Sequence, residues 1–417
     1  MNDPDLPPSG RALLVPASSA GNLFDEVAAT LGRKWKARSV PRHGRSYRCR
    51  CGRPIFFRNS ECLACGAPLG YEPLLGEVRA LEPGETAGGW RLARPAADAR
   101  GGGSAPAGAL ATEPAAEYRR CSNYEMAAGC NWLVSADDPQ PRCRACRLNR
   151  FIPNQSDEEN RRYWHSIEVA KRRLVSQLIM LGLPVRSKLG EDPERGLAFD
   201  FLRELPGAPP VVTGHAGGLV TLNAEEADDA KRERIRHALR EPYRTLLGHL
   251  RHEVGHYYWD RLIAGTRWHE PCRALFGDER ADYAAALRAN YERGPRPDWA
   301  RQHISAYASV HPWEDWAETW AHYLHAIDSL DTALGFGLDA DDVEAETDPF
   351  GPDDLYEPAH PQGARFLAVL NAWVELTTVL NELSHSMGQP DFYPFVMSRP
   401  VVRKLHFVHL VVQSARG

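Results

Sequence analysis

One short stretch, residues 247–259, carries side chains whose types and spacing can hold a metal ion. It contains His-Glu-x-x-His, with His252 and His256 four positions apart and Glu253 beside the first histidine. This pattern on a helix is typical of zinc hydrolases, because two imidazoles at that spacing leave one helix face about 40° apart around the axis. A catalytic zinc keeps one coordination position open for water. Glu253, on the flank of that face, can accept a proton from the activated water.

The flanking residues predict that this helix is buried along one side. Apolar side chains recur at helical spacing at Leu246, Leu247, Leu250, Val254 and Tyr258. Pro242 suits the first turn of the helix. His249 lies three residues before His252 and suits a supporting or solvent-facing role better than metal binding.

A zinc site needs a third protein ligand, and a second segment offers candidates. Glu314, Glu318 and His322 recur every four residues after Pro312, where a second helix is expected to begin. Burying such groups among tryptophans is costly without a partner, although a solvated polar stripe is the alternative interpretation. Tyr307 precedes this helix, and a phenol near the metal could stabilise the oxyanion formed during attack.

Other polar residues have simpler explanations. Asp278 and Asp282 are alternative third ligands, but both stand where a helix opens and suit capping better. His215 lies between glycines and suits a turn or a substrate contact equally well. His322 and His325 are expected to form hydrogen bonds within the helix pair.

The two segments resemble the gluzincin peptidases of the lethal-factor type, in which a Glu-x-x-Ala-Glu helix follows the His-Glu-x-x-His helix. The resemblance implies that Glu314 is the third zinc ligand and that Tyr307, seven residues earlier, stabilises the transition state. It also implies that Glu318 orients a ligand histidine.

The chain from about residue 47 onward more closely resembles a bacterial family of zinc-binding metallopeptidases with an N-terminal zinc ribbon. The matching pieces, beside the two helices, are residues 51–60, 130–134, 170–174, 213–215 and 276–280. This resemblance implies a peptidase but says little about its substrate.

Eight of the nine cysteines fall into two groups with spacings that suit zinc. The first group consists of Cys49, Cys51, Cys62 and Cys65, with a glycine after each pair. The second consists of Cys121, Cys130, Cys143 and Cys146. Four thiolates form a closed, structural zinc site, so two zinc ribbons are predicted. The first pair is Cys-x-Cys, which departs from the usual knuckle and leaves His43 as an alternative ligand, while the lone Cys272 is expected in the core.

These patterns predict an α+β protein with a zincin-like metallopeptidase domain after two small zinc ribbons. We expect a flexible basic extension at 1–46, ribbons at 47–82 and 118–154, and the peptidase at 155–417. Residues 83–117, rich in Ala, Gly and Pro, are expected to form a disordered linker.

Within the peptidase domain, periodicity predicts a long helix over residues 158–181 and helices near 227–239, 365–383 and 401–412. Strands are expected at 197–202, 211–213 and 219–222. By resemblance, residues 219–223 are the sheet edge on which an extended peptide lies.

The net charge of −5 is unevenly distributed. Residues 33–53 carry nine basic and no acidic side chains, which favours a solubilising tail, with nucleic-acid contact as the alternative. No apolar stretch predicts a membrane span, and the acidic, Pro-rich start is unlike a signal peptide. Cysteines in metal-like spacings favour a reducing compartment, so we expect a cytoplasmic protein.

The sequence therefore predicts a zinc-dependent peptidase with one catalytic and up to two structural zinc ions, acting on a peptide or protein substrate. Two alternatives stay open, a nucleic-acid-associated zinc-ribbon protease and a non-catalytic adaptor that zinc stabilises. The oligomeric state is not predicted.

Overall fold

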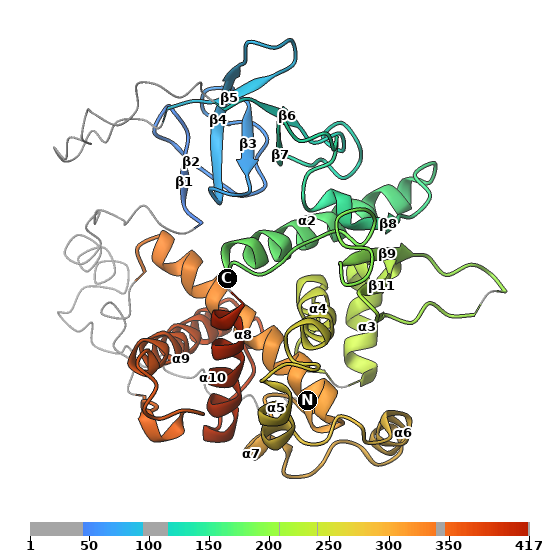
Figure 1. Cartoon of the computed structure of the whole chain (residues 1–417), viewed down its shortest axis with the longest axis vertical. Coiled ribbons are helices and arrows are strands. Elements are labelled where there is room, and N and C mark those ends of the chain that lie inside the picture. Colours follow the sequence, from blue (N-terminus) through green and yellow to red (C-terminus); the bar gives the residue numbers. More distant parts are fainter. Residues whose placement is uncertain (1–44, 95–115, 208, 240, 339–346, 416–417) are drawn as a thin grey trace, which may run out of the picture. The chain divides into compact units, whose positions relative to one another are not determined.

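The computed structural model describes residues 45–94, 116–207, 209–239, 241–338 and 347–415 (Figure 1). These residues form a mixed helix-and-sheet protein, as predicted, in which a zinc-ribbon region precedes a largely helical domain with a small sheet. His43, the alternative zinc ligand, and most of the basic stretch lie outside the described residues.

The zinc-ribbon region contains a β1-β2 pair and a five-stranded antiparallel sheet in the order β3-β4-β5-β6-β7. The strands are β1 (Tyr47–Arg48), β2 (Pro54–Ile55), β3 (Leu69–Glu72), β4 (Glu77–Pro83), β5 (Trp90–Leu92), β6 (Tyr118–Arg120) and β7 (Leu133–Ser135). A single sheet thus joins the segments that carry the two cysteine groups.

The expectation of a disordered linker at 83–117 is wrong at its beginning, because β5 lies within it. β5 pairs with β4 on one side and with β6 on the other. Composition did not reveal this strand, since its stability comes from backbone pairing with segments distant in sequence. Residues 95–115 of the expected linker lie outside the described residues.

The second sheet has the order β10-β11-β9-β8, formed by β8 (Asn149–Phe151), β9 (Ala198–Leu202), β10 (Gly214–Ala216) and β11 (Leu219–Asn223). β9 pairs in parallel with β8 and β11, whereas β10 and β11 form an antiparallel hairpin. β9 and β11 lie where strands were expected. The strand expected at 211–213 forms instead at Gly214–Ala216, because Gly217 and Gly218, both with positive φ, make the tight hairpin turn themselves.

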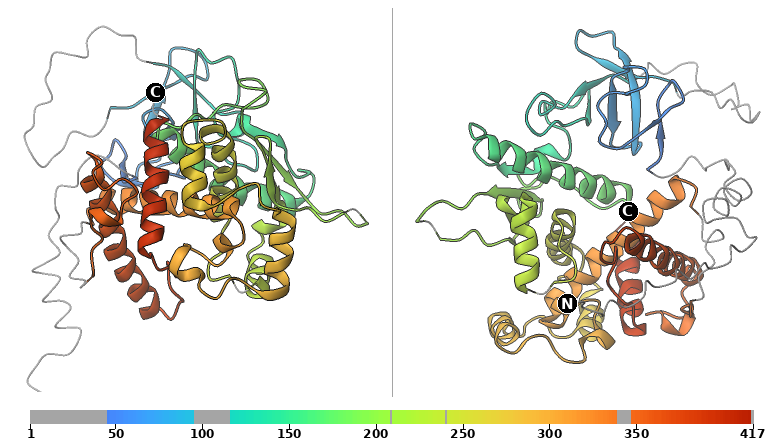
Figure 2. Two further views of the ribbon diagram at one scale, coloured as in Figure 1. Left: turned by 60° about the horizontal axis from the view of Figure 1, so that its bottom comes forward. Right: turned by 180° about the vertical axis from the view of Figure 1, so that it is seen from behind.

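Helices supply most of the domain. They are α2 (Glu158–Met180), α3 (Asp229–Leu239), α4 (Leu246–Leu262), α5 (His269–Phe276), α6 (Tyr283–Arg293), α7 (Trp299–Gln302), α8 (Pro312–Gly335), α9 (Gly363–Ser386) and α10 (Arg399–Ser414). Short 3-10 turns are η1 (Cys146–Leu148), η2 (Ala224–Ala227), η3 (Tyr307–Ser309) and η5 (Pro352–Asp354). The two views of Figure 2 show α9 and α10 beside α8, and each of them contacts α8.

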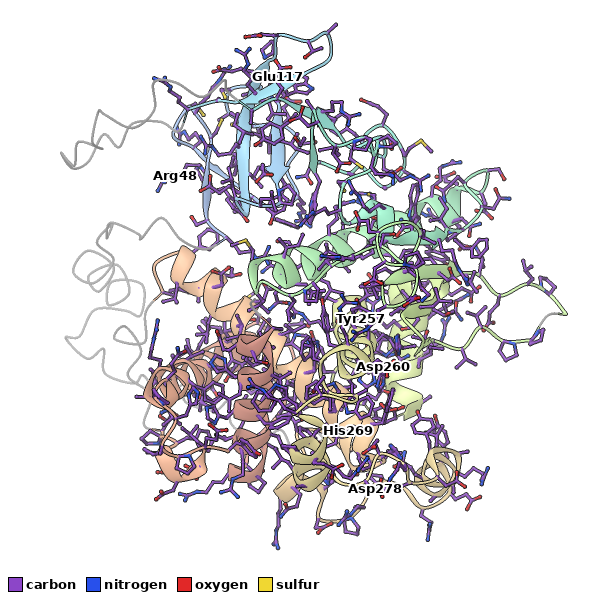
Figure 3. The ribbon with its side chains drawn as sticks, in the orientation of Figure 1. Arg48, Glu117, Tyr257, Asp260, His269 and Asp278 are labelled. Atoms are coloured by element: carbon purple, nitrogen blue, oxygen red, sulfur yellow. The ribbon has the colours of Figure 1, made fainter. Side chains whose placement is uncertain are left out.

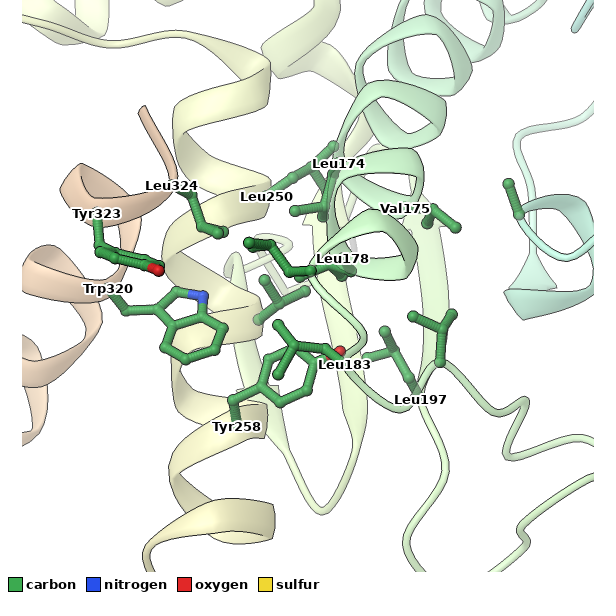
Figure 4. Packing of buried hydrophobic residues seen from close by; sticks show 14 of the residues in the cluster. Leu174, Val175, Leu178, Leu183, Leu197, Leu250, Tyr258, Trp320, Tyr323 and Leu324 are labelled. Carbon is green, nitrogen blue, oxygen red and sulfur yellow. The ribbon is translucent and has the colours of Figure 1, made fainter. Parts of the chain in front are cut away.

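The core of the domain lies where α2, α4 and α8 meet (Figure 4). Leu174 and Leu178 of α2 pack against Leu250 of α4, and Trp320 of α8 stacks on Tyr258 of α4 with ring centroids 4.8 Å apart. Burial of such side chains contributes roughly 1.5–3 kcal/mol each. The two helices expected to carry metal ligands are therefore part of this core.

Among the described residues, one helix, α9, is long and apolar enough to cross a membrane by length and composition alone. Its most apolar window has a mean hydropathy of 1.2 and is 39% buried. Phe366, Leu370 and Trp373 are buried on one side of α9, as in a helix that packs against a protein core. The expectation of no membrane span stays a prediction.

Candidate metal centre

The His-Glu-x-x-His helix, α4, begins at Leu246, four residues after Pro242, so Pro242 does not lie in its first turn as expected. Its N-cap is Thr245, whose hydroxyl accepts a hydrogen bond from the amide of Gly248 at 3.0 Å. The threonine hydroxyl satisfies one of the first amides of the helix, which have no carbonyl partner within it, so the helix starts there. His252, Glu253 and His256 are all buried in the middle of α4.

The second site helix, α8, begins at Pro312 as expected. The side chain of His311 caps it by accepting a hydrogen bond from the amide of Trp313 at 3.0 Å. Glu314 lies in the first turn, where a carboxylate is favoured by the helix dipole, and it is 2% exposed. The cap thus fixes the position of a buried acidic side chain.

A glycine lets α4 and α8 approach closely at the site. A Cβ on Gly255 would lie 3.0 Å from the Cα of Ala317, a distance that side chains rarely tolerate. The indole nitrogen of Trp316 donates a hydrogen bond to the carbonyl of Gly255 at 2.8 Å. This contact brings the first turn of α8 against the two histidines of α4.

His252, His256 and Glu314 converge, with their ligand atoms all within 4.8 Å of one another. Oε2 of Glu314 lies 3.0 Å from Nε2 of His252 and 3.6 Å from Nε2 of His256. Zinc at roughly 2.0–2.2 Å from each atom requires separations of roughly 3–3.6 Å, so these three groups fit one zinc ion. Asp278, Asp282 and His322 do not belong to this group.

Glu318, one turn after Glu314 on α8, contacts His252 on the side of the imidazole ring that faces away from Glu314. Its Oε1 lies 2.7 Å from Nδ1 of His252, and its Oε2 accepts a hydrogen bond from the hydroxyl of Ser305 at 2.6 Å. Burial raises the pKa of Glu318, but His252 outweighs this effect and lowers it to about 2. The arrangement leaves Nε2 of His252 facing Glu314.

Glu253 and Tyr307 lie beside this group. Glu253 is 7% exposed, and its Oε2 has no hydrogen-bond partner among the described residues. An unpaired buried carboxylate is costly unless a further group, such as water or substrate, interacts with it. The ring of Tyr307, in η3, lies 5.9 Å from the ring of His252.

Tyr283 is a site residue that the sequence analysis missed. Its hydroxyl donates a hydrogen bond to Oε1 of Glu314 at 2.8 Å and also bonds to Tyr307. Burial and the neighbouring Glu314 raise the pKa of Tyr283 well above its usual range, although the hydrogen bond with Tyr307 acts in the opposite direction. No local sequence pattern marks Tyr283, because it lies at the start of α6 and reaches Glu314 of α8 only in the folded chain.

The remaining acidic candidates have other roles. Asp282 caps α6 by accepting a hydrogen bond from the amide of Ala285 at 2.9 Å, as expected. Asp278, labelled in Figure 3, pairs with Arg280 at 2.8 Å.

The other histidines also find partners away from the metal group. His249 lies 2.5 Å from Glu226, and His325 lies 2.6 Å from Arg251 of α4, which is a contact within the helix pair as expected. His322 departs from that expectation, since its Nδ1 lies 2.7 Å from the hydroxyl of Tyr393, between α9 and α10.

His215 is placed in β10 and faces the site. Its ring lies 6.5 Å from that of His256 and 6.3 Å from that of Tyr257, which Figure 3 labels. Its Nε2 accepts a hydrogen bond from the amide of Gly218 in the hairpin turn. Burial, together with His256 and Lys188, lowers the pKa of His215 to about 4.

The first cysteine group comes together despite its Cys-x-Cys spacing. The sulfur atoms of Cys49 and Cys65 lie 3.7 Å apart, and those of Cys51 and Cys62 lie 3.8 Å apart. Zinc–sulfur bonds of roughly 2.3 Å in a tetrahedron place the sulfur atoms roughly 3.8 Å apart, so the group fits a zinc ion. The glycines after each pair, Gly52 and Gly66, have φ of 81° and 66°, as a tight turn requires.

The second cysteine group is wholly buried and lies against α2. It consists of Cys121, Cys130, Cys143 and Cys146, and its ligand atoms also lie within 4.8 Å of one another. The sulfur of Cys146 is 3.8 Å from Oε2 of Glu168 in α2. Arg172 of α2 donates a hydrogen bond to the carbonyl of Ala128 at 3.1 Å. Cys272, the ninth cysteine, is buried in α5 as expected.

Comparison with known proteins gives the family. The family described as "putative zinc-binding metallo-peptidase" matches residues 160–411, and a zinc-ribbon domain family matches residues 46–157. Uncharacterized proteins of Mycobacterium bovis and Mycobacterium tuberculosis are 37% identical to this chain over 376 residues, which cover 89% of this chain and 96% of each relative. No solved structure matches the chain. The chain therefore belongs to this zinc-binding metallo-peptidase family, as its motifs indicated.

Proposed function

We propose that this protein is a zinc-dependent peptidase of the gluzincin class, in which His252, His256 and Glu314 hold the catalytic ion. The observation that carries this proposal is the convergence of these three groups on two buried helices, beside Glu253, whose Oε2 has no hydrogen-bond partner in the described part of the chain. Such a pair of helices fixes ligand positions more tightly than loops do.

The chemistry divides among the residues around the ion. A zinc ion held by His252, His256 and Glu314 would polarise the scissile carbonyl and make water a better nucleophile. Glu253 takes the proton from the attacking water and passes it to the leaving amine. Tyr307 donates a hydrogen bond to the developing oxyanion, and Glu318 keeps the imidazole of His252 oriented.

The strand expected by resemblance to receive the substrate has no free edge. β11, at residues 219–223, lies between β10 and β9, so both of its edges are already paired. β10 carries the outer edge, with no further strand beside it among the described residues, and it contacts α4. We therefore propose that an extended peptide pairs with Gly214–Ala216.

The two cysteine groups hold structural zinc in this proposal, which gives three zinc ions per chain. Experiments can distinguish this peptidase from the two alternatives, a nucleic-acid-associated protease and a non-catalytic adaptor. A nucleic-acid-associated protease would bind nucleic acid with a steep salt dependence. A cytoplasmic location is likewise a proposal.

The test compares the full chain with its Glu253→Gln variant. We expect both proteins to contain three zinc equivalents by elemental analysis, but only the unaltered chain to cleave members of a diverse peptide library. Loss of the base alone should reduce kcat by at least about 10²-fold. If a fully zinc-loaded chain cleaves nothing in the library, the adaptor is the better description.

A further inference from the structure

A cavity of about 850 Å³ lies between the zinc-ribbon region, α2, α8 and the segment that joins α9 to α10. Ser166, Val169, Ala170 and Arg173 line it from one face of α2. Its volume falls in the range of sites that bind small organic molecules, roughly 300–1,000 Å³. The residues proposed as the catalytic metal ligands are not in its wall.

Three arginines in the wall share one buried carboxylate. Asp328 of α8 accepts hydrogen bonds from Arg45 at 3.0 Å, from Arg173 at 2.7 Å and from Arg251 at 2.6 Å. Arg45, Arg251 and Asp328 are all at least nine-tenths buried. Asp331 is a second acidic residue near this cluster, 3.8 Å from Arg45, and its side chain is 46% exposed.

The cluster is therefore short of negative charge. Counted over the described residues, three guanidinium groups against Asp328 and the half-exposed Asp331 leave a net positive charge beside the cavity. Nε of Arg251 has no hydrogen-bond partner among the described residues. Unneutralised buried charge is unfavourable, and guanidinium groups match carboxylate and phosphate oxygens closely.

Aromatic side chains form a second part of the wall, beside polar residues such as Arg58, Asn59 and Thr332. Phe56 and Phe57 enter from the zinc-ribbon region, Phe336 from the end of α8, and Trp373 and Tyr393 from the C-terminal part of the chain. Aromatic and aliphatic surface of this kind favours an apolar body. The cavity thus offers a cationic group of side chains and an apolar wall to the same occupant.

We propose that this cavity binds a small organic anion, a carboxylate or phosphate ester with an aromatic or aliphatic body. The anionic group accepts hydrogen bonds at Arg173 and Arg251, and the body packs on the aromatic side chains. This site is separate from the proposed peptidase centre, although Arg251 directly precedes His252 on α4.

The test uses two dyes that share a body and differ in charge, 8-anilinonaphthalene-1-sulfonate and neutral N-phenyl-1-naphthylamine, titrated into the full chain by fluorescence. We expect the sulfonate to bind at one site per chain and at least about tenfold more tightly than the neutral dye. Arg173→Met should weaken the sulfonate about tenfold and leave the neutral dye unchanged. Arg162→Met, which removes the same charge from an exposed position on α2, is the control and should change neither.

Two further measurements locate the site and identify the head group. Ala170→Phe narrows the cavity and should weaken both dyes, with zinc content confirming that the variant is folded. Displacement of the sulfonate by decanoate indicates a carboxylate ligand, and displacement by 1-naphthyl phosphate indicates a phosphate ester. Equal affinity for the two dyes, an unchanged Kd in Arg173→Met, or displacement by neither compound would overturn the proposal.

Discussion

At the scale of single residues, Glu314 and Glu318 differ in what they touch. Glu314 faces the Nε2 atoms of both histidines, whereas Glu318 contacts Nδ1 of His252 and the hydroxyl of Ser305. Both carboxylates have depressed pKa values because His252 is close, so charge alone does not distinguish them.

Glu314→Ala should therefore remove most of the zinc from the histidine site, because a ligand oxygen is lost. Glu318→Ala should only weaken zinc binding by about 10–100-fold, because it frees the ring of His252. Competition with a fluorescent zinc chelator measures both affinities. If Glu318→Ala loses the metal and Glu314→Ala keeps it, the ligand assignment is wrong by one helical turn.

Substitutions of Tyr307 and Tyr283 should likewise have different effects, one on kcat and the other on zinc affinity. Tyr307→Phe should lower kcat by about 10²–10³-fold with zinc affinity unchanged, because we propose that its hydroxyl stabilises the transition state. Tyr283→Phe should instead lower zinc affinity, since its hydroxyl bonds to Glu314. Steady-state kinetics at saturating zinc together with the chelator titration distinguish the two, and a kcat effect confined to Tyr283→Phe would reverse their roles.

At the scale of elements, the site depends on how closely α4 and α8 approach. Gly255→Ala would gain roughly 0.5–1 kcal/mol of helix propensity but place a methyl 3.0 Å from the backbone of Ala317. Overpacking of this kind costs roughly 1–3 kcal/mol, so we expect a net loss of about 1–2 kcal/mol and weaker zinc binding.

Urea denaturation of the zinc-loaded chain measures this loss. Gly190→Ala is the matched control, because nothing lies within 4 Å of the added Cβ. A Gly255→Ala variant as stable as the unaltered chain, with unchanged zinc affinity, would show that the helices can separate without cost.

At the scale of the whole molecule, the second cysteine group and the peptidase domain share their supports. β8 follows Cys146 and pairs with β9, and Asn149 donates a hydrogen bond to the buried Glu168 of α2 at 2.8 Å. Lys171 also bonds to Glu168, at 2.6 Å. The sheet therefore begins before residue 155, within the range expected for the second ribbon.

A chain that starts at Gln155 should be unstable or insoluble, because it lacks β8 and leaves Glu168 and Lys171 of α2 without Asn149. Cys146→Ser should lower the Tm of the full chain by on the order of 10 °C, because a structural zinc site supplies folding free energy. Cys51→Ser, in the more exposed first group, should lower it less. A soluble Gln155 fragment with an unchanged helical melting transition would contradict this coupling.

Much of the site was predictable because it depends on local spacing. The four-residue interval places His252 and His256 on one helix face whatever surrounds them, and the same is true of Glu314 and Glu318. The turns after the cysteine pairs follow from glycine's access to positive φ. Helices α2, α9 and α10 follow from apolar periodicity, which reports burial within one continuous segment.

Tertiary structure decided what local spacing could not. The choice of Glu314 over Asp278 or Asp282 depends on the contact between Gly255 and α8, between segments about sixty residues apart. Tyr283 and the cationic cavity arise in the same way, from side chains that meet only after folding. The sheet edge belongs to β10 rather than β11, since strand pairing depends on which backbone groups neighbouring strands have already occupied.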